Sequence, residues 1–238
     1  MSTLTNEYGQ PIGAPVPGWT PRPLPTKETF EGTFCRLERL SAARHVDDLY
    51  EAYRAAADDR DWTYLSVGPF KEIDAYRRHA EAAERSVDPR HYAVIDKNTG
   101  KAVGTLALMR MDPGSGVIEV GFVVFSPLLK RTPISTEAQF LLMAYAFDEL
   151  GYRRYEWKCD SLNGPSRAAA ERLGFTFEGV FRQAVVYHGR NRDTAWFSIL
   201  DKEWPVRKQA FMAWLSAENF DEAGQQRASL SELRKRYL

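Results

Sequence analysis

Apolar and polar residues alternate along several short segments of the chain. The clearest case is Arg153–Asp160, where Tyr155, Trp157 and Cys159 alternate with charged residues. This period of two is typical of a β-strand with one buried face. Val117–Phe125 is nearly continuous in apolar residues, which is typical of a central strand covered on both faces. The other predicted strands are Phe30–Leu40, His91–Asp96, Ala102–Met111, and a final pair, Thr176–Tyr187 and Thr194–Leu200, joined across His188–Asp193.

Segments with apolar residues three and four positions apart predict helices between these strands. Ser41 is a suitable N-cap for a helix that carries Val46 and Leu49 on its apolar face. Asn163 is a suitable cap for a short helix that ends before Gly174. The other predicted helices are Lys71–Ser86, Thr136–Leu150, one that opens at Trp204-Pro205 and a last one after Ser229.

The order of these elements predicts an α+β fold with a mixed, mostly antiparallel central sheet flanked by helices. This domain is expected over residues 31–203, with a helical C-terminal extension over 204–238. Residues 1–30 form a Pro-rich arm, because six prolines between positions 11 and 25 favour extended backbone. Ile12, Val16, Trp19 and Leu24 give this arm apolar side chains to bury, so we expect it to lie along the domain.

Composition and charge narrow the class of protein. The 238 residues are 44% apolar and include 6 Trp, 11 Tyr and 13 Phe, which is enough for a large core and excludes global disorder. Lys and Arg together equal Asp and Glu together at 32, so the net positive charge of a typical nucleic-acid binder is absent. The apolar runs are too short to span a membrane. We therefore expect neither a nucleic-acid nor a membrane partner.

The N-terminus and the cysteines indicate a cytoplasmic protein. Met1–Gln10 is polar and lacks the order of a secretory signal. Cys35 and Cys159 are the only cysteines, and each is expected to be a free thiol. Because no second cysteine lies near either one, a zinc site of the cysteine type is excluded. No metal is expected.

Two segments carry a resemblance to a known family. The first is Glu-Val-Gly-Phe from Glu119, followed by Ser-Pro-Leu-Leu-Lys-Arg-Thr-Pro-Ile-Ser-Thr-Glu-Ala up to Ala138. The second runs from Asn163 to Arg182 and contains Asn-x-x-Ser, Gly-Phe and Glu-Gly. They resemble the GCN5-related N-acetyltransferase superfamily, and within it the branch of ribosomal-protein N-terminal alanine acetyltransferases. The resemblance covers Phe34–Leu200 and agrees with the order of elements.

The resemblance implies acyl transfer from acetyl-CoA to the primary amine of a small molecule or of a peptide or protein N-terminus. A non-catalytic module that keeps the fold and binds an acyl-CoA or a protein is the alternative. Dimers are common for this fold, so a homodimer is an open option.

In this superfamily the pyrophosphate of acetyl-CoA lies on amides of a loop that enters a helix, with the pattern Gln/Arg-x-x-Gly-x-Gly/Ala. The aligned residues here are Lys130, Pro133 and Ser135, and a proline offers no N–H group. Side-chain donors of the same loop could substitute. A loop that no longer binds coenzyme A is the alternative. The residues that the resemblance assigns to the cofactor are Phe125, Lys130, Arg131, Thr132, Ser135, Thr136, Asn163 and Arg167.

The resemblance also suggests catalytic residues. Glu119 lies where family members often carry a carboxylate that acts as general base through water. A structural carboxylate is the alternative. Ser166 matches the serine that protonates the departing thiolate, although a serine in a first helical turn often only bonds to backbone. An acidic residue of this branch is replaced by Val185.

The acceptor site is expected between two walls. Tyr64, Arg182, Tyr187 and His188 are the candidate substrate-binding residues. Arg182 clusters with Arg190 and Arg192, and this cluster could bind a carboxylate or a phosphate on the substrate or could be a solvated turn. His188, next to Gly189, is also compatible with a solvated turn. Trp62 and Phe70 are expected in the opposite wall with Tyr64, or in ordinary core.

Overall fold

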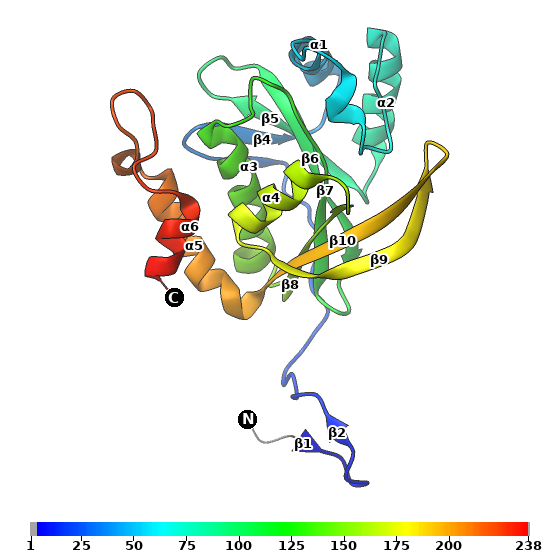
Figure 1. Ribbon diagram of the computed structural model, residues 1–238, viewed down its shortest axis with the longest axis vertical. Coiled ribbons are helices and arrows are strands. Elements are labelled where there is room, and N and C mark those ends of the chain that lie inside the picture. The colour runs from blue at the N-terminus through cyan, green and yellow to red at the C-terminus, as the bar shows by residue number, and fades with distance from the viewer. Residues whose placement is uncertain (1–3, 238) are drawn as a thin grey trace.

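The centre of the protein is an eight-stranded sheet, and the computed structural model describes residues 4–237. The strands are β3 (Thr29–Glu31), β4 (Cys35–Arg39), β5 (Arg90–Asp96), β6 (Ala102–Asp112), β7 (Val117–Phe125), β8 (Arg154–Asp160), β9 (Thr176–Tyr187) and β10 (Arg190–Leu200). Their order is β3-β4-β5-β6-β7-β8-β10-β9. Figure 1 labels all of these strands except β3. β7 and β8 are parallel, and the other neighbouring pairs are antiparallel. The predicted mixed, mostly antiparallel sheet is confirmed.

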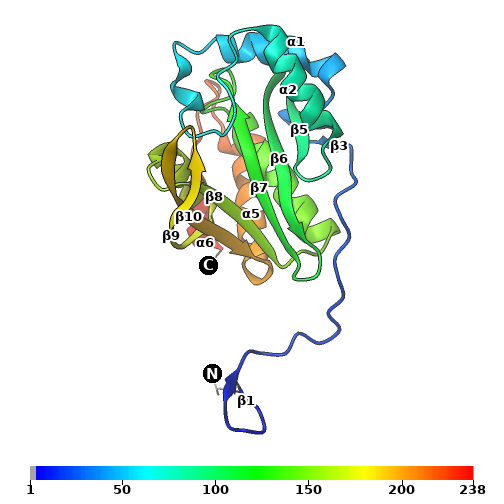
Figure 2. The same ribbon diagram turned by 90° about the vertical axis from the view of Figure 1, so that its right-hand side faces the viewer.

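Helices cover both faces of this sheet. They are α1 (Ala42–Arg54), α2 (Ile73–Arg85), α3 (Pro133–Ala144), α4 (Gly164–Leu173), α5 (Trp204–Leu215) and α6 (Leu230–Arg236). α1 and α2 pack on one face of β5 and β6 through residues such as Leu49 and Ala80. α3 and α5 pack on the other face in the larger core, which contains Leu142, Tyr155 and Phe211 (Figure 2). α6 packs on α5 and α4, so the C-terminal extension covers its own domain.

β7 and β8 stay paired over only part of their length. Their register runs from Val117 opposite Arg154 to Val120 opposite Trp157. Beyond this point, residues 121–125 of β7 remain paired with β6, while residues 158–160 of β8 remain paired with β10. A bulge in β7, where Phe122 has a φ of 46°, accompanies the change of direction. We call the region between these two unpaired segments the strand opening (Figure 2).

Several boundaries differ from the sequence prediction, and three of these differences change the local structure. The strand expected over Phe30–Leu40 is a hairpin of β3 and β4, because the Glu137 carboxylate accepts hydrogen bonds from the backbone N–H groups of the turn at residues 33–35. β10 begins at Arg190 rather than Thr194, so the turn after β9 is only two residues long. α3 begins at Pro133, where the fixed φ of proline suits the first helical position.

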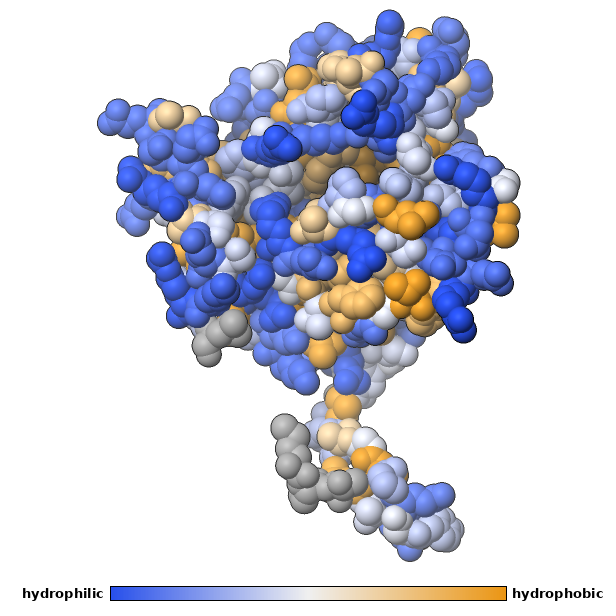
Figure 3. All heavy atoms as spheres, viewed as in Figure 1, coloured by the Kyte–Doolittle hydropathy of each residue, from blue (hydrophilic) through white to orange (hydrophobic). Residues whose placement is uncertain are grey.

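The N-terminal arm contacts the domain from Trp19 onward. The Trp19 indole N–H donates to the Gly114 carbonyl at 2.7 Å, and the Arg22 guanidinium lies 4.3 Å from the ring centroid. Ile12, Val16 and Leu24 are exposed, so their expected burial is wrong. On the N-terminal side of Trp19 the chain forms a small hairpin of β1 (Leu4–Thr5) and β2 (Pro11–Ile12). This hairpin projects from the body and has apolar residues on its surface (Figure 3).

Candidate active site

The loop before α3 leaves the amides of the first helical turn without a side-chain cap. The Thr132 hydroxyl donates to the Leu129 carbonyl at 2.7 Å instead. The Ser135 hydroxyl donates to the Thr132 carbonyl at 2.8 Å. Thr136 is buried and its hydroxyl accepts from Arg172 of α4 at 3.0 Å, which ties the two helices together. Amide groups at an uncapped helix N-terminus are suited to bind an anion.

Two cationic residues precede this helix. Lys130 forms an ion pair with Asp61 at 2.5 Å, so its charge is shared with the loop between α1 and α2. Arg131 is exposed and has a φ of 62°, in the left-handed region. An anion at the start of α3 would therefore meet both cations but would share Lys130 with Asp61.

The start of α4 positions Ser166 beside β8. The Asn163 side chain accepts from the Ser166 backbone N–H at 3.1 Å, which confirms that Asn163 caps this helix. The Ser166 hydroxyl oxygen accepts from the Trp157 indole N–H at 3.0 Å. Arg167 donates to the Ser161 carbonyl at 3.2 Å and lies over the Phe177 ring. These bonds fix the turn in which Ser166 lies.

Other residues around Ser166 come from the ends of β7 and β8. Phe125 ends β7 and is half-buried against the main core. Burial raises the pKa of the Cys159 thiol, while a hydrogen bond from Ser166 and the charges of Arg192 and Arg167 lower it. Ser166 and Arg192 therefore both lie close to the C-terminal end of β8.

Glu119 belongs to a buried network of ion pairs. Glu119 is 3% exposed, and its carboxylate accepts from Arg110 at 3.1 Å and from Lys158 at 2.9 Å. Lys158 also pairs with Glu156 at 2.7 Å and lies 3.7 Å from the Trp196 ring centroid. Two cations, Arg110 and Lys158, thus occupy the Glu119 carboxylate.

This network continues across the sheet. Arg154 bonds to Glu156 at 2.6 Å and to Glu178 of β9 at 2.8 Å, and the Ser198 hydroxyl donates to Glu178. The hydrogen bond from Arg154 holds the pKa of the Glu178 carboxyl below its usual value. Each carboxylate in the paired part of β7 and β8 therefore has a cationic partner.

Asp160 at the end of β8 differs from these carboxylates. It is 4% exposed and accepts from the Tyr187 hydroxyl at 2.7 Å and from the Leu162 backbone N–H at 2.9 Å. No cationic side chain within residues 4–237 forms an ion pair with it. Burial and the Asp160 hydrogen bond raise the pKa of Tyr187 to about 12, so the phenol keeps its proton near neutral pH. No sequence motif pointed to Asp160, although it closes the alternating pattern three residues before Asn163.

The loop between α1 and α2 meets the tip of the β9–β10 hairpin. His188 Nε2 lies 2.9 Å from the Leu65 carbonyl, and Arg190 donates to the Thr63 carbonyl at 2.9 Å. Tyr64 is half-buried between these two contact points. The two expected walls of the acceptor site are therefore in contact, whereas Arg182 is exposed further along β9.

A small pocket lies under this loop, against the bulge of β7. Trp62 packs edge-on against Tyr53 and Phe70, with ring centroids 5.5 Å apart in both pairs. His91 and Phe122 complete one side, and burial lowers the pKa of His91 to about 4. The cavity of about 20 Å³ holds little more than one water molecule.

Within residues 4–237, no group of three or more His, Cys, Asp or Glu side chains has an arrangement that could hold a metal ion. No helix in this part of the chain is both long and apolar enough to cross a bilayer.

Comparison with known proteins places this geometry in a family. Residues 36–176 match the family described as "Acetyltransferase (GNAT) domain". A GCN5-related N-acetyltransferase from Brucella melitensis is 53% identical with a TM-score of 0.91, and the alignment covers 92% of this chain and 100% of that one. A GNAT-family protein from Chromobacterium violaceum is 42% identical with a TM-score of 0.76, covering 82% and 98%.

More distant relatives have names that mention the ribosome. YdaF of Bacillus subtilis, provisionally named a ribosomal N-acetyltransferase, is 31% identical over 109 residues, and the alignment spans 46% of this chain and 59% of YdaF. An acetyl transferase of Salmonella typhimurium, described as modifying the N-terminal serine of ribosomal protein L7/L12, shares the fold at 20% identity and a TM-score of 0.59, covering 71% and 96%. The match over most of the domain, together with the Brucella relative, shows that this chain belongs to the GCN5-related N-acetyltransferase family and is an N-acetyltransferase.

Proposed function

We propose that acetyl-CoA is the acyl donor and that it lies in the strand opening, with its pyrophosphate at the start of α3. The observation that carries this proposal is that the opening adjoins an uncapped helix N-terminus. The amides of Ile134 and Ser135 and the helix dipole favour an anion there, and Lys130 and Arg131 add positive charge. Pro133 removes only the amide of the first helical position, so the loop keeps donors that fit a pyrophosphate.

Acetyl-CoA supplies an activated acyl group, and two side chains of this chain can move the protons that its transfer requires. Ser166 accepts from Trp157 through its oxygen, so its own proton can pass to the coenzyme A sulfur as the carbon–sulfur bond breaks. This role was expected from the family resemblance. The cap at Asn163 holds the serine at the first turn of α4, next to the end of β8.

Asp160 is the better candidate for general base than Glu119. Arg110 and Lys158 occupy the Glu119 carboxylate, whereas Asp160 accepts only from neutral groups. As the carbon–nitrogen bond forms, the attacking nitrogen becomes more acidic, and Asp160 takes its proton directly or through one water. Tyr187 orients the carboxylate by donating to it. Glu119 then has the structural role that the sequence left open.

The acceptor is a primary amine, and the Salmonella relative is described as modifying the N-terminal serine of a ribosomal protein. Contact between the α1–α2 loop and the β9–β10 tip restricts the route to the opening, which favours a small amine or a free chain end over a side chain on a folded surface. Nothing in the comparisons favours the non-catalytic module. The cytoplasmic location, the homodimer and the domain boundaries stay predictions.

Titration calorimetry with acetyl-CoA tests the proposal. At 100 times its dissociation constant the ligand should raise the free energy of unfolding by ~2.7 kcal/mol. Ser135→Asp places a negative charge in the first turn of α3, and repulsion of the pyrophosphate should weaken binding by about tenfold or more, which corresponds to ~1.4 kcal/mol.

Ser231→Asp makes the same change in the first turn of α6 and is the matched control, because that helix lies outside the opening. Its affinity for acetyl-CoA should equal that of the unmodified protein. The absence of heat and of stabilisation at millimolar acetyl-CoA, or equal affinities of the two variants, would contradict the proposed location.

A further inference from the structure

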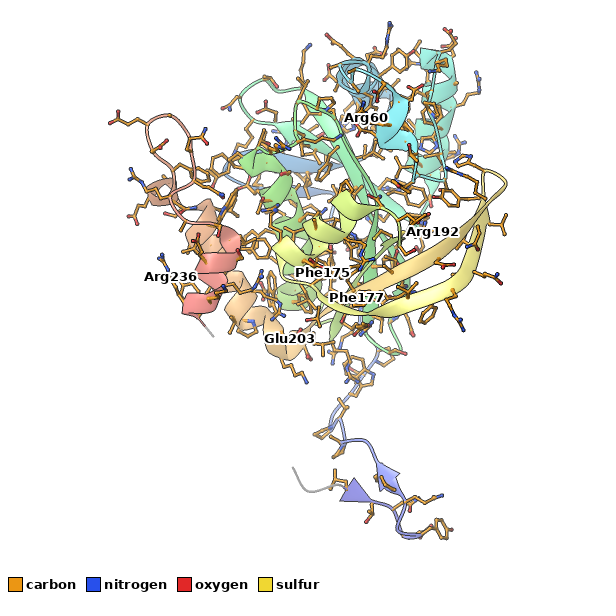
Figure 4. All side chains as sticks on the ribbon, in the orientation of Figure 1. Arg60, Phe175, Phe177, Arg192, Glu203 and Arg236 are labelled. Carbon is orange, nitrogen blue, oxygen red and sulfur yellow. The ribbon has the colours of Figure 1, made fainter. Side chains whose placement is uncertain are left out.

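The charges around the strand opening are not balanced in pairs. Thr194 of β10 lies opposite Asp160 of β8, so Arg192, two residues earlier on β10, lies on the same face of the sheet just beyond the end of β8. Figure 4 labels Arg192 on β10. Its bond to the Thr194 hydroxyl and its place near the Tyr187 ring fix the position of the guanidinium.

Arg192 uses few of its hydrogen-bond donors. The half-buried guanidinium donates from Nε to the Thr194 hydroxyl at 3.2 Å and lies 6.0 Å from the Tyr187 ring centroid. It has no carboxylate partner among the residues that the structure describes. A guanidinium has five N–H donors in a planar fork that matches the two oxygens of a carboxylate. A partly desolvated cation of this kind is best stabilised by an anion.

Arg190 adds a second positive charge near Tyr187 and would also attract an anion. The Arg190 guanidinium lies 5.4 Å from the Tyr187 ring centroid and donates to the Thr63 carbonyl, again without a carboxylate partner within residues 4–237. Asp160 has no cationic partner within residues 4–237 and accepts from the hydroxyl of Tyr187, whose ring lies near the two arginines. The site thus presents a negative group and a positive group on the two sides of one phenol.

We propose that the acceptor carries a carboxylate close to its reacting amine, with the carboxylate bound by Arg192 and the amine facing Asp160 and Tyr187. This inference rests on the proposed function, because it assigns the acceptor of the same opening. An ammonium group approaching Asp160 and a carboxylate approaching Arg192 would each gain a charge-assisted hydrogen bond that the protein alone does not provide. A neutral amine would satisfy Asp160 and leave Arg192 without an anion.

Two sources can supply such a carboxylate, a free amino acid or the acidic side chain of the first residue of a peptide. The test measures kcat/KM at saturating acetyl-CoA for two matched pairs of acceptors. One pair is free glutamate and its α-amide, and the other is a C-terminally amidated tripeptide that begins with Glu or with Gln. The amine of an amino acid amide is the weaker base and is more often deprotonated, so amine reactivity alone favours the amide.

The expected result is that the carboxylate-bearing member is preferred by about tenfold to a hundredfold in one of the two pairs, in the range of a charge-assisted hydrogen bond. The pair that shows the preference identifies the source. Arg192→Gln should abolish it through KM of the acceptor, with KM for acetyl-CoA unchanged. Arg192→Lys should keep part of it, because the charge remains while the fork is lost.

Arg236→Gln is the matched control, because Arg236 is exposed on α6 at the other end of the molecule (Figure 4). It should retain the full preference. Calorimetric titration of each acceptor into the complex with coenzyme A reads acceptor binding without turnover. The inference is overturned if neither pair shows a preference, if Arg192→Gln keeps it, or if that variant changes acetyl-CoA affinity instead. If acetyl-CoA itself gives no heat, the proposed function has failed.

Discussion

The paired part of β7 and β8 and the strand opening carry similar charged residues. These residues form ion pairs in the paired part but not in the opening. Where the strands are paired, Glu119 lies opposite Glu156, and Lys158 bridges both carboxylates. Where the strands diverge, Asp160 is not paired with a residue of β7, and neither Asp160 nor Arg192 of the neighbouring β10 has an ion-pair partner within residues 4–237. Strand register alone produces this difference. It indicates that the paired half contributes stability, while the opening keeps charges available for a ligand.

Asp160→Asn should have the largest effect on turnover. If Asp160 is the base, kcat/KM should fall by about 10²–10⁴, the range of general acid–base catalysis, with acetyl-CoA affinity unchanged. Steady-state kinetics over a range of pH checks this expectation. An Asn variant that folds and turns over at the original rate would remove Asp160 from the mechanism.

Ser166→Ala should cost less than the loss of Asp160. A water molecule can replace a hydroxyl as proton donor, so we expect kcat/KM to fall by about 10², near the lower end of the same range. The measurement is the rate of thiol release from acetyl-CoA at saturating acceptor, compared between the variant and the unmodified protein. A variant with undiminished kcat would leave the serine with only its role beside Trp157.

Glu119→Gln should affect turnover least among the three carboxylate and hydroxyl changes. Lys158 keeps Glu156 as a partner, so the network stays charged around the opening. We expect less than about a tenfold decrease in kcat/KM, below the range for a lost general base, and the same pH profile. A decrease as large as that for Asp160→Asn, with a shifted pH profile, would restore Glu119 as the base.

Tyr187→Phe tests whether the phenol keeps its proton at high pH. Of these changes it should have the smallest effect, and this effect is on the pH dependence of the free energy of unfolding. The pKa of Tyr187 is raised from 10.0 to about 12, so its contribution to stability is full below pH 10 and is lost as the pH rises towards 12. The free energy of unfolding of the unmodified protein should therefore fall more steeply over this interval than that of the variant. If the free energy of unfolding depends on pH equally in the two proteins, the pKa of the Tyr187 phenol is not raised in the folded state.

Most of the fold could be predicted from the sequence because local patterns report local burial. The alternation in Arg153–Asp160 and the caps at Asn163 and Ser229 each describe one element, and all three are confirmed. The hairpin of β3 and β4 was missed because its turn is held by Glu137, about a hundred residues away in sequence. No local pattern contains that contact.

The residues of the candidate site could be predicted from the sequence only where they belong to a motif of the family. Ser166 and the loop before α3 came from the family resemblance, whereas the network around Glu119 depends on the parallel register of β7 and β8. Asp160 was missed for the same reason. In the sequence it is one more polar residue of an alternating strand, and only the divergence of β7 distinguishes it from Glu156.

The most direct test of this account is the free energy of unfolding of the ligand-free protein, compared between Glu119→Gln and Asp160→Asn by denaturant titration. Glu119→Gln removes a partner of the buried Lys158 and should lower this free energy by about 1–3 kcal/mol. Asp160→Asn removes a buried charge that has no counter-ion and should leave the free energy unchanged or raise it. If Asp160→Asn destabilises the protein as much as Glu119→Gln does, the charges at the opening are structural and the account is contradicted.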